Sequence, residues 1–267
     1  MEIIQHYKNL YSLQDRILDL LVKYDFNLYL TGGTALNRFI CAENSRFSDD
    51  LDFFTAESTL SARNEIIEFT QVLKENNAKI IVDSSDFKMI IFDENLKIDL
   101  VRDACGRVGR LSSENGFLLD NARNILSNKC YAAYSRDAIR DLFDIYIIVK
   151  NFNFDFEQIA KDLSGKCSND IEEIVARIKS FSLEMLDEKD LKCKNKFILE
   201  DFKNNYHKIF KDFFSLTNIQ NAQKILETKN FDELPAQPTN NAKATMMTYS
   251  PRINAEVSSI NKSSLLW

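Results

Sequence analysis

The sequence predicts an α+β protein in which a mixed sheet flanked by helices is followed by a C-terminal helical domain. Short apolar runs between residues 27 and 101 have the length and the bounding turns of strands. From Ala122 to about Leu226, apolar residues instead recur at helical spacing. Only 6 Gly and 3 Pro interrupt the 267 residues, which favours a helix-rich chain.

This pattern divides the chain into three parts. Residues 1–118 are expected to form a core around the sheet, and residues 119–234 a helical domain that completes the active site. Residues 235–267 are rich in Pro, Asn, Ser, Thr and Ala and have weak periodicity, so we expect a poorly ordered tail.

Composition excludes several classes of protein. A net charge of -6 gives no global basic field for nucleic acid, although a local basic patch is possible among 34 Lys and Arg. The five cysteines are scattered without a C-x-x-C pair, and there are only two histidines, so zinc, disulfides and a Ser/His/Asp triad have little support. No signal peptide and no apolar run of membrane-spanning length is present, so we expect a cytoplasmic protein without a membrane partner.

The N-terminal half is expected to supply the sheet. Residues 3–24 form one long or two short amphipathic helices that cover one of its faces. The next elements are a strand at 27–31, a helix at 33–42, a strand at 50–55, a helix at about 60–75, and a meander of strands at 79–82, 87–92 and 96–101. The polar segment 102–115 is predicted to be a loop.

The second half is predicted to be helical. One helix starts at Ala122, and the next contains Arg136 to Tyr146, with apolar residues on nearly every side. The charged residues of such a helix are expected to be paired or to line a cleft, the alternative being weak ion pairs on a solvated face. Ordinary amphipathic helices are expected near 156–163, 170–181, 183–189 and 196–214.

The strongest candidate for a site lies within residues 28–55. Gly32-Gly33-Thr34 breaks a strand and opens a helix, where free backbone N–H groups favour the phosphates of a triphosphate. Asp50 and Asp52 point to one face of the next strand, where two carboxylates can converge on divalent cations. Each feature alone is more often an ordinary turn or a solvated acid. Together they favour phosphoryl or nucleotidyl transfer.

A third acid strengthens this hypothesis. Asp99 lies between aliphatic residues in the strand 96–101, and it could join Asp50 and Asp52 as a metal ligand or be a solvated edge residue. We favour the site interpretation because the other pair is present. Hard oxygen ligands and the shortage of His indicate Mg²⁺, with two ions expected and Mn²⁺ possible.

Several segments, in the right order, resemble the AbiEii/AbiGii nucleotidyltransferase toxins of the DNA polymerase beta-like nucleotidyltransferase superfamily. Residues 31–36 and 46–53 resemble the first family motif, and 97–99 resembles the strand that supplies the third acid. Residues 125–129 resemble the helix with a phosphate-facing lysine, and Arg136 with 140–146 resembles the closing helix. Departures are Leu126, where the family often has Asp, and Thr34, where the wider superfamily has Ser.

The resemblance implies a metal-dependent toxin of a type IV toxin–antitoxin or abortive-infection system. It would move an NMP from an NTP to an acceptor, which is expected to be RNA, namely the 3′ end of tRNA. It would also have a separately encoded antitoxin, expected to be a DNA-binding regulator. The catalytic residues implied are Asp50, Asp52, Asp99, Lys129 and Asp141, of which the first three hold metal. Nucleotide contacts are expected from Gly32, Gly33, Thr34, Ser48, Lys129, Arg136, Arg140 and Asp144.

Two alternatives stay open at this point. The acceptor could be a small molecule such as an aminoglycoside. The chain could instead be a non-catalytic nucleotide-binding partner that acts only by protein contact. The second would be expected to lack a metal acid, and here both Asp50 and Asp52 are present.

Overall fold

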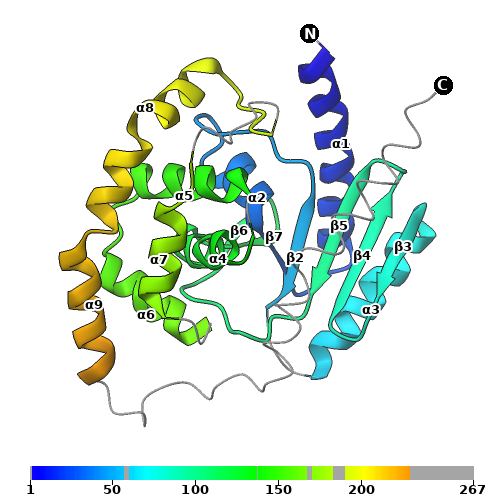
Figure 1. The fold of residues 1–267 in the computed structure, drawn as a ribbon. Helices are drawn as coiled ribbons and strands as arrows, with labels where there is room; N and C mark the ends of the chain where they lie inside the picture. Colours follow the sequence, from blue (N-terminus) through cyan, green and yellow to red (C-terminus); the bar gives the residue numbers. More distant parts are fainter. Residues whose placement is uncertain (1, 57–59, 137, 167–169, 183–189, 229–267) are drawn as a thin grey trace.

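A computed structural model describes residues 2–56, 60–136, 138–166, 170–182 and 190–228. Its centre is a seven-stranded mixed sheet with the strand order β3-β4-β5-β2-β1-β7-β6 (Figure 1). The strands are β1 (Leu28–Thr31), β2 (Leu51–Thr55), β3 (Ala78–Asp83), β4 (Phe87–Phe92), β5 (Leu96–Val101), β6 (Ser112–Glu114) and β7 (Phe117–Leu119). The predicted mixed sheet with flanking helices is confirmed.

The pairing of the central strands decides which side chains meet. Strand β2 runs antiparallel to β1 and parallel to β5, and β3, β4 and β5 form the expected antiparallel meander. Because side chains alternate along a strand, Leu51 and Phe53 of β2 face one side of the sheet together with Ile98 and Leu100 of β5. All four are fully buried, so this face belongs to the core.

Two amphipathic helices cover the core face. Helix α1 (Glu2–Lys23) is a single long helix, and its buried stripe includes Ile17 and Leu21. Helix α3 (Leu60–Glu75) contributes Phe69 to the same hydrophobic cluster. The opposite face of β2 and β5 therefore remains available for a site.

The helical part packs beside the sheet (Figure 1). It consists of α4 (Ala122–Ser135), α5 (Ile139–Asn151), α6 (Phe156–Lys166), α7 (Ile171–Lys179), α8 (Lys196–Phe213) and α9 (Leu216–Thr228). Helix α5 is buried on nearly every side, as its sequence indicates. The helix expected at 183–189 and the tail expected at 235–267 lie outside the described residues.

The prediction of a loop through 102–115 is wrong in its last part. Strands β6 and β7 form a hairpin there, and β7 adds to the sheet in parallel with β1. The turn is Asn115-Gly116, and both residues have positive φ angles, 47° and 90°. Asn-Gly is the preferred pair for such a tight hairpin turn, so the dipeptide was the signal for this element.

The predicted helix containing Arg136 is also wrong at its start. Helix α4 ends at Ser135 and α5 begins at Ile139, with Arg136 and Ala138 both in extended conformation. Arg136 therefore lies at the junction between two helices and not one turn before Arg140. The helix expected at 33–42 likewise divides, into the short α2 (Gly32–Thr34) and the π-helix η1 (Ala35–Ile40).

None of the described helices is long and apolar enough to cross a membrane.

Candidate active site

Three aspartates meet on the face of the sheet opposite the core. Asp52 in β2 lies directly opposite Asp99 in β5, and Asp50 comes one residue before β2 begins. All three line one cavity of about 440 Å³ between this face of the sheet and helix α4. The acids that sequence reasoning selected are thus brought together.

The glycine turn lies against these acids because it has no side chains. Gly32 has a φ of +69°, and a Cβ atom there would stand 2.2 Å from Oδ2 of Asp52. A Cβ atom on Gly33 would stand 2.7 Å from Nη2 of Arg46. Both glycines line the cavity. With any other residue at these two positions, the side chain would prevent the backbone of the turn from lying so close to the acids.

Thr34 and Ser48 are buried behind the cavity wall and are not among its lining residues. Oγ1 of Thr34 lies 2.9 Å from Oγ of Ser48, and it also contacts the backbone carbonyl of Asp50. Gln14 donates from Nε2 to the carbonyl of Ser48 at 3.2 Å. These contacts fix the backbone that carries Asp50, so we assign both hydroxyls a positioning role.

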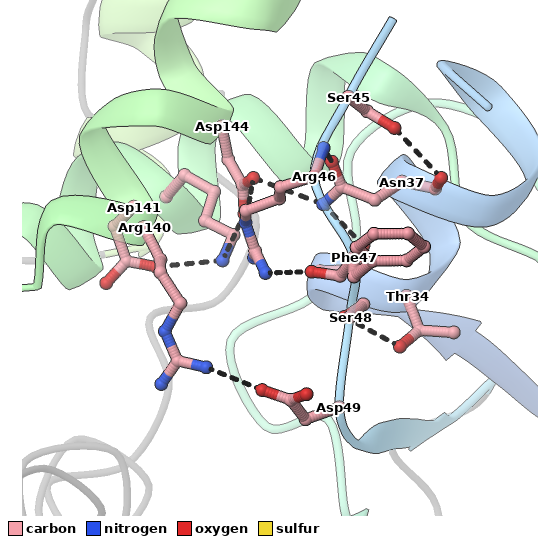
Figure 2. A network of polar contacts seen from close by, with 12 residues as sticks. Thr34, Asn37, Ser45, Arg46, Phe47, Ser48, Asp49, Arg140, Asp141 and Asp144 are labelled. Atoms are coloured by element: carbon pink, nitrogen blue, oxygen red, sulfur yellow. Dashed lines mark hydrogen bonds and ion pairs between the residues drawn. The ribbon is translucent and has the colours of Figure 1, made fainter. Parts of the chain in front are cut away.

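A buried network of charged residues forms the basic end of the cavity (Figure 2). Arg46 donates to both carboxylate oxygens of Asp144, at 2.9 Å and 2.8 Å. Lys129 bridges Asp141 at 2.8 Å and Asp144 at 2.9 Å. Arg136 donates to both oxygens of Asp141, at 2.7 Å and 3.1 Å. Two acids of α5 therefore hold three cations in place.

Asp144 lies further from the cavity than the sequence suggested. Its side chain is fully buried, it does not line the cavity, and Nδ2 of Asn37 also donates to it at 3.1 Å. Arg46 and Lys129 stand between Asp144 and the cavity space. Its contacts are those of a residue that positions cations.

Arg140 extends from α5 to the rim of the cavity (Figure 2). Nη1 lies 3.5 Å from Oδ2 of Asp49, and nearly half of the arginine side chain is exposed. Asp49 also accepts a hydrogen bond of 2.5 Å from the hydroxyl of Tyr7. Asp49 therefore holds Arg140 at the rim of the cavity but does not line the cavity itself.

Sequence reasoning assigned no role to two cations of the site. Arg46 is almost fully buried and reaches the cavity wall. Lys97 precedes Asp99 by two residues in β5, so both side chains share a face, and the ammonium group contacts the Asp99 carboxylate. The i, i+2 spacing of Lys97 and Asp99 was a signal for this contact. Arg46 begins the segment 46–53 that resembles the family motif, but nothing in that segment indicates its contact with Asp144.

The electrostatics of the three acids differ. Burial, reinforced by the charges of Asp50 and Asp99, raises the pKa of Asp52 to about 7. Burial also opposes ionisation of Asp50, but the surrounding cations, led by Lys97 and Arg140, outweigh burial and lower its pKa. The cluster therefore concentrates negative charge that Lys97 balances only in part.

Among the described residues, no group of three or more Asp, Glu, His or Cys side chains has the arrangement needed to hold a metal ion. Asp99 is engaged by Lys97 instead. The donor set is nonetheless all carboxylate oxygen, which suits Mg²⁺ or Mn²⁺ better than softer metals. The raised pKa of Asp52 reflects its burial and the neighbouring charges of Asp50 and Asp99.

Comparison with known proteins decides the family. The family model described as "Nucleotidyl transferase AbiEii toxin, Type IV TA system" matches residues 16–236. The chain belongs to the AbiEii nucleotidyltransferase toxin family. No curated protein matches it.

Several solved structures are similar to this AbiEii family member, and MenT4 shares its fold. MenT4, a nucleotidyltransferase toxin from Mycobacterium tuberculosis, is 15% identical with a TM-score of 0.52, over 82% of this chain and 93% of its own. JHP933 from Helicobacter pylori is 22% identical with a TM-score of 0.45, over 82% and 98%. ANT(2″)-Ia, solved with adenylyl-2″-tobramycin, is 13% identical with a TM-score of 0.45, over 59% and 96%.

Proposed function

We propose that this AbiEii family member transfers a nucleoside monophosphate from an NTP to the 3′ end of an RNA, with tRNA as the expected acceptor. The observation that carries the proposal is the placement of Asp50, Asp52 and Asp99 in one cavity with a cluster of buried cations. Carboxylates that attract divalent cations, beside fixed cations that attract phosphates, are the two requirements of nucleotidyl transfer.

The proposal includes a divalent metal requirement, with two Mg²⁺ ions expected and Mn²⁺ as a substitute. Asp50 and Asp52 would hold the metal, with Asp99 as the third ligand. Bound metal would supply charge stabilisation to the attacking and leaving oxygens of the displacement. The Asp99 carboxylate contacts the ammonium group of Lys97, so Asp99 would have to release this contact before it could bind a metal ion.

The basic end of the cavity is proposed to hold the outer phosphates. Lys129, Arg136 and Arg140 line it, and two acids of α5 fix the first two in position. Burial alone would lower the pKa of Lys129, but Asp141 and Asp144 outweigh it and raise the pKa, so the ammonium stays charged. Cations fixed before the substrate arrives stabilise developing negative charge without reorganising.

The proposed step is an in-line displacement at the α-phosphorus. The acceptor hydroxyl oxygen forms a bond to phosphorus while the bond from phosphorus to the bridging oxygen of the β-phosphate breaks. The electron pair leaves with pyrophosphate, and Asp99 takes the hydroxyl proton. Gly32 and Gly33 give the phosphates room against the acids, because any side chain there would fill the space.

We further propose that a separately encoded antitoxin, expected to be a DNA-binding regulator, accompanies this protein. Membership of a type IV toxin–antitoxin family supports that expectation. The neighbouring gene provides the check. A small DNA-binding protein encoded immediately upstream, whose co-expression relieves toxicity, is the expected result.

The direct experiment incubates purified protein with each labelled NTP, Mg²⁺ and deacylated tRNA. We expect label on the tRNA 3′ end from at least one NTP, loss of label with a chelator, and loss of label in Asp52→Asn. Full transfer by Asp52→Asn would contradict the assignment of the site.

A parallel reaction replaces tRNA with an aminoglycoside such as tobramycin. We expect no labelled product there. Label on the aminoglycoside and none on RNA would favour the small-molecule alternative.

A further inference from the structure

The cavity wall changes its chemistry along strand β2. Asp50 lies near the basic end, where Arg46, Lys129 and Arg140 contribute to the charge around it. Beyond Asp52, the next residue on the same face is Phe54, and its partner in β5 is Val101. The wall is therefore basic on one side of the Asp52–Asp99 pair and apolar on the other.

The apolar side is built as a row across three strands. Phe54 of β2 pairs with Val101 of β5, which pairs with Phe87 of β4. All three line the cavity, together with Val82 of β3. These residues form a hydrophobic cluster separate from the main core. The row lies one strand repeat, about 6.5 to 7 Å, beyond the two aspartates.

Nucleotidyl transfer gives this arrangement a direction. In an in-line displacement the attacking and leaving oxygens lie on opposite sides of the α-phosphorus. The basic end would take the leaving pyrophosphate, so the attacking hydroxyl must approach from the other side. The apolar row of Phe54, Val101 and Phe87 lies on that side.

The rim of the apolar side does not suit a polycation. Asp86 is the acid there, and it accepts hydrogen bonds from Arg102 at 2.6 Å and from Arg63 at 2.9 Å. Burial opposes its ionisation, but the two guanidinium groups outweigh burial and hold the pKa of Asp86 at about 2. One carboxylate between two arginines leaves a positive rim, which complements the phosphates of a nucleic acid strand and repels an aminoglycoside.

We propose that Phe54, Phe87 and Val101 form the binding site for the base of the acceptor's 3′-terminal nucleotide. Aromatic side chains bind bases of any sequence through their flat faces, and stacking of this kind is common where single strands are held without base readout. Arg102, which lines the cavity, contacts a phosphate that flanks this base. The inference rests on the proposed nucleotidyl transfer and adds the place where the acceptor binds.

The test compares Phe87→Leu with Phe92→Leu. Both residues belong to β4, but Phe92 is fully buried in the main core on the other face of the sheet. The probe is fluorescent deacylated tRNA with a 3′-deoxy end, which cannot react, prepared with and without its 3′-terminal base. Fluorescence anisotropy gives its Kd, and isothermal titration calorimetry gives the Kd of the NTP.

We expect Phe87→Leu to weaken binding of the intact tRNA by about tenfold, because part of a base-stacking contact is lost. Binding of tRNA without its terminal base should not change between wild type and Phe87→Leu. Phe92→Leu should leave both values within about twofold, and NTP affinity should be equal in all three proteins.

Two results would overturn the inference. A weaker NTP affinity in Phe87→Leu would assign the row to the base of the incoming nucleotide. An equal loss in Phe87→Leu and Phe92→Leu, or with both forms of tRNA, would reduce the row to a structural role. Absence of any transfer by the wild type would instead refute the proposed function, and the binding comparison does not depend on transfer.

Discussion

Arg46 donates two hydrogen bonds to Asp144, a residue 98 positions further along the chain. Both side chains are almost fully buried, and the pair joins the loop that precedes β2 to helix α5 (Figure 2). Lys129 shares the same carboxylate. The pair therefore connects the sheet to the helical part at the place where the cavity forms.

Breaking this pair should destabilise the protein strongly. Asp144→Ala leaves the buried Arg46 without a carboxylate and leaves Lys129 with Asp141 alone, so we expect a loss of about 3 to 5 kcal/mol in the free energy of unfolding. Denaturant titration measures it. The control is Asp15→Ala, which breaks the exposed 2.6 Å pair with Arg38 and should cost less than about 1 kcal/mol. Equal losses in the two variants would mean that the Arg46–Asp144 pair has no special structural role.

Gly32→Ala should abolish transfer. The φ of +69° disfavours any side chain, and the new Cβ would collide with the Asp52 carboxylate. Displacement of that carboxylate should lower the transfer rate by about 100-fold or more. Gly165 in α6 offers the matched control, because an added Cβ there meets nothing within 4 Å. Gly165→Ala should keep full activity and gain about 0.5 to 1 kcal/mol. Near-normal transfer by Gly32→Ala would refute the close approach.

Asp52→Asn should stabilise the metal-free protein while it removes activity. The folded-state pKa of about 7 lies above the ordinary 3.8, so the charged form of Asp52 costs folding free energy at high pH. At pH 8 we expect the variant to be more stable than wild type by about 1 to 3 kcal/mol. The difference should shrink as the pH falls from about 7 towards 4, because wild-type Asp52 becomes protonated in the folded state. Thermal unfolding across this range, with a chelator present, measures it. A difference that does not vary with pH would contradict the raised pKa.

Lys97→Gln should bind metal more tightly. The Lys97 ammonium contacts Asp99 and adds positive charge beside Asp50, so it competes with a divalent cation for the same carboxylates. Its removal should raise Mn²⁺ affinity by about tenfold, or about 1.4 kcal/mol. Calorimetric titration with Mn²⁺ is the measurement.

Lys88→Gln is the control for this experiment. Lys88 lies on the neighbouring strand opposite Leu100, on the other face of the sheet, and it pairs with Asp83. Its variant should bind Mn²⁺ as wild type does. Weaker binding in Lys97→Gln would indicate that the lysine organises the acids and does not compete with metal.

Much of the sheet could be predicted from local periodicity. The strands β4 and β5 coincide with the expected ranges, and alternation along a strand was enough to place Asp52 and Phe53 on opposite faces. The near-complete burial of α5 followed from its apolar residues in the same way. These features depend on backbone geometry within one element, which the order of residues encodes directly.

Two features, the β6–β7 hairpin and the break between α4 and α5, were harder to predict because little in the local sequence marks them. The hairpin β6–β7 is marked only by Asn115-Gly116, within a segment whose polar composition is typical of a loop. The break between α4 and α5 carries no Gly or Pro, so periodicity runs across it into Arg136. Helices α4 and α5 pack against each other, with the backbone extended at Arg136 and Ala138 between them.

By itself, the sequence determined which residues share a strand face or a helix: Asp52 with Phe54, Lys97 with Asp99, Asp141 with Asp144. Tertiary structure alone decided that Arg46 meets Asp144, and that Asp52 stands opposite Asp99 across the parallel pair of β2 and β5. The physical reason is distance along the chain. Contacts within an element follow from its repeat, whereas contacts between distant segments depend on how whole faces pack together.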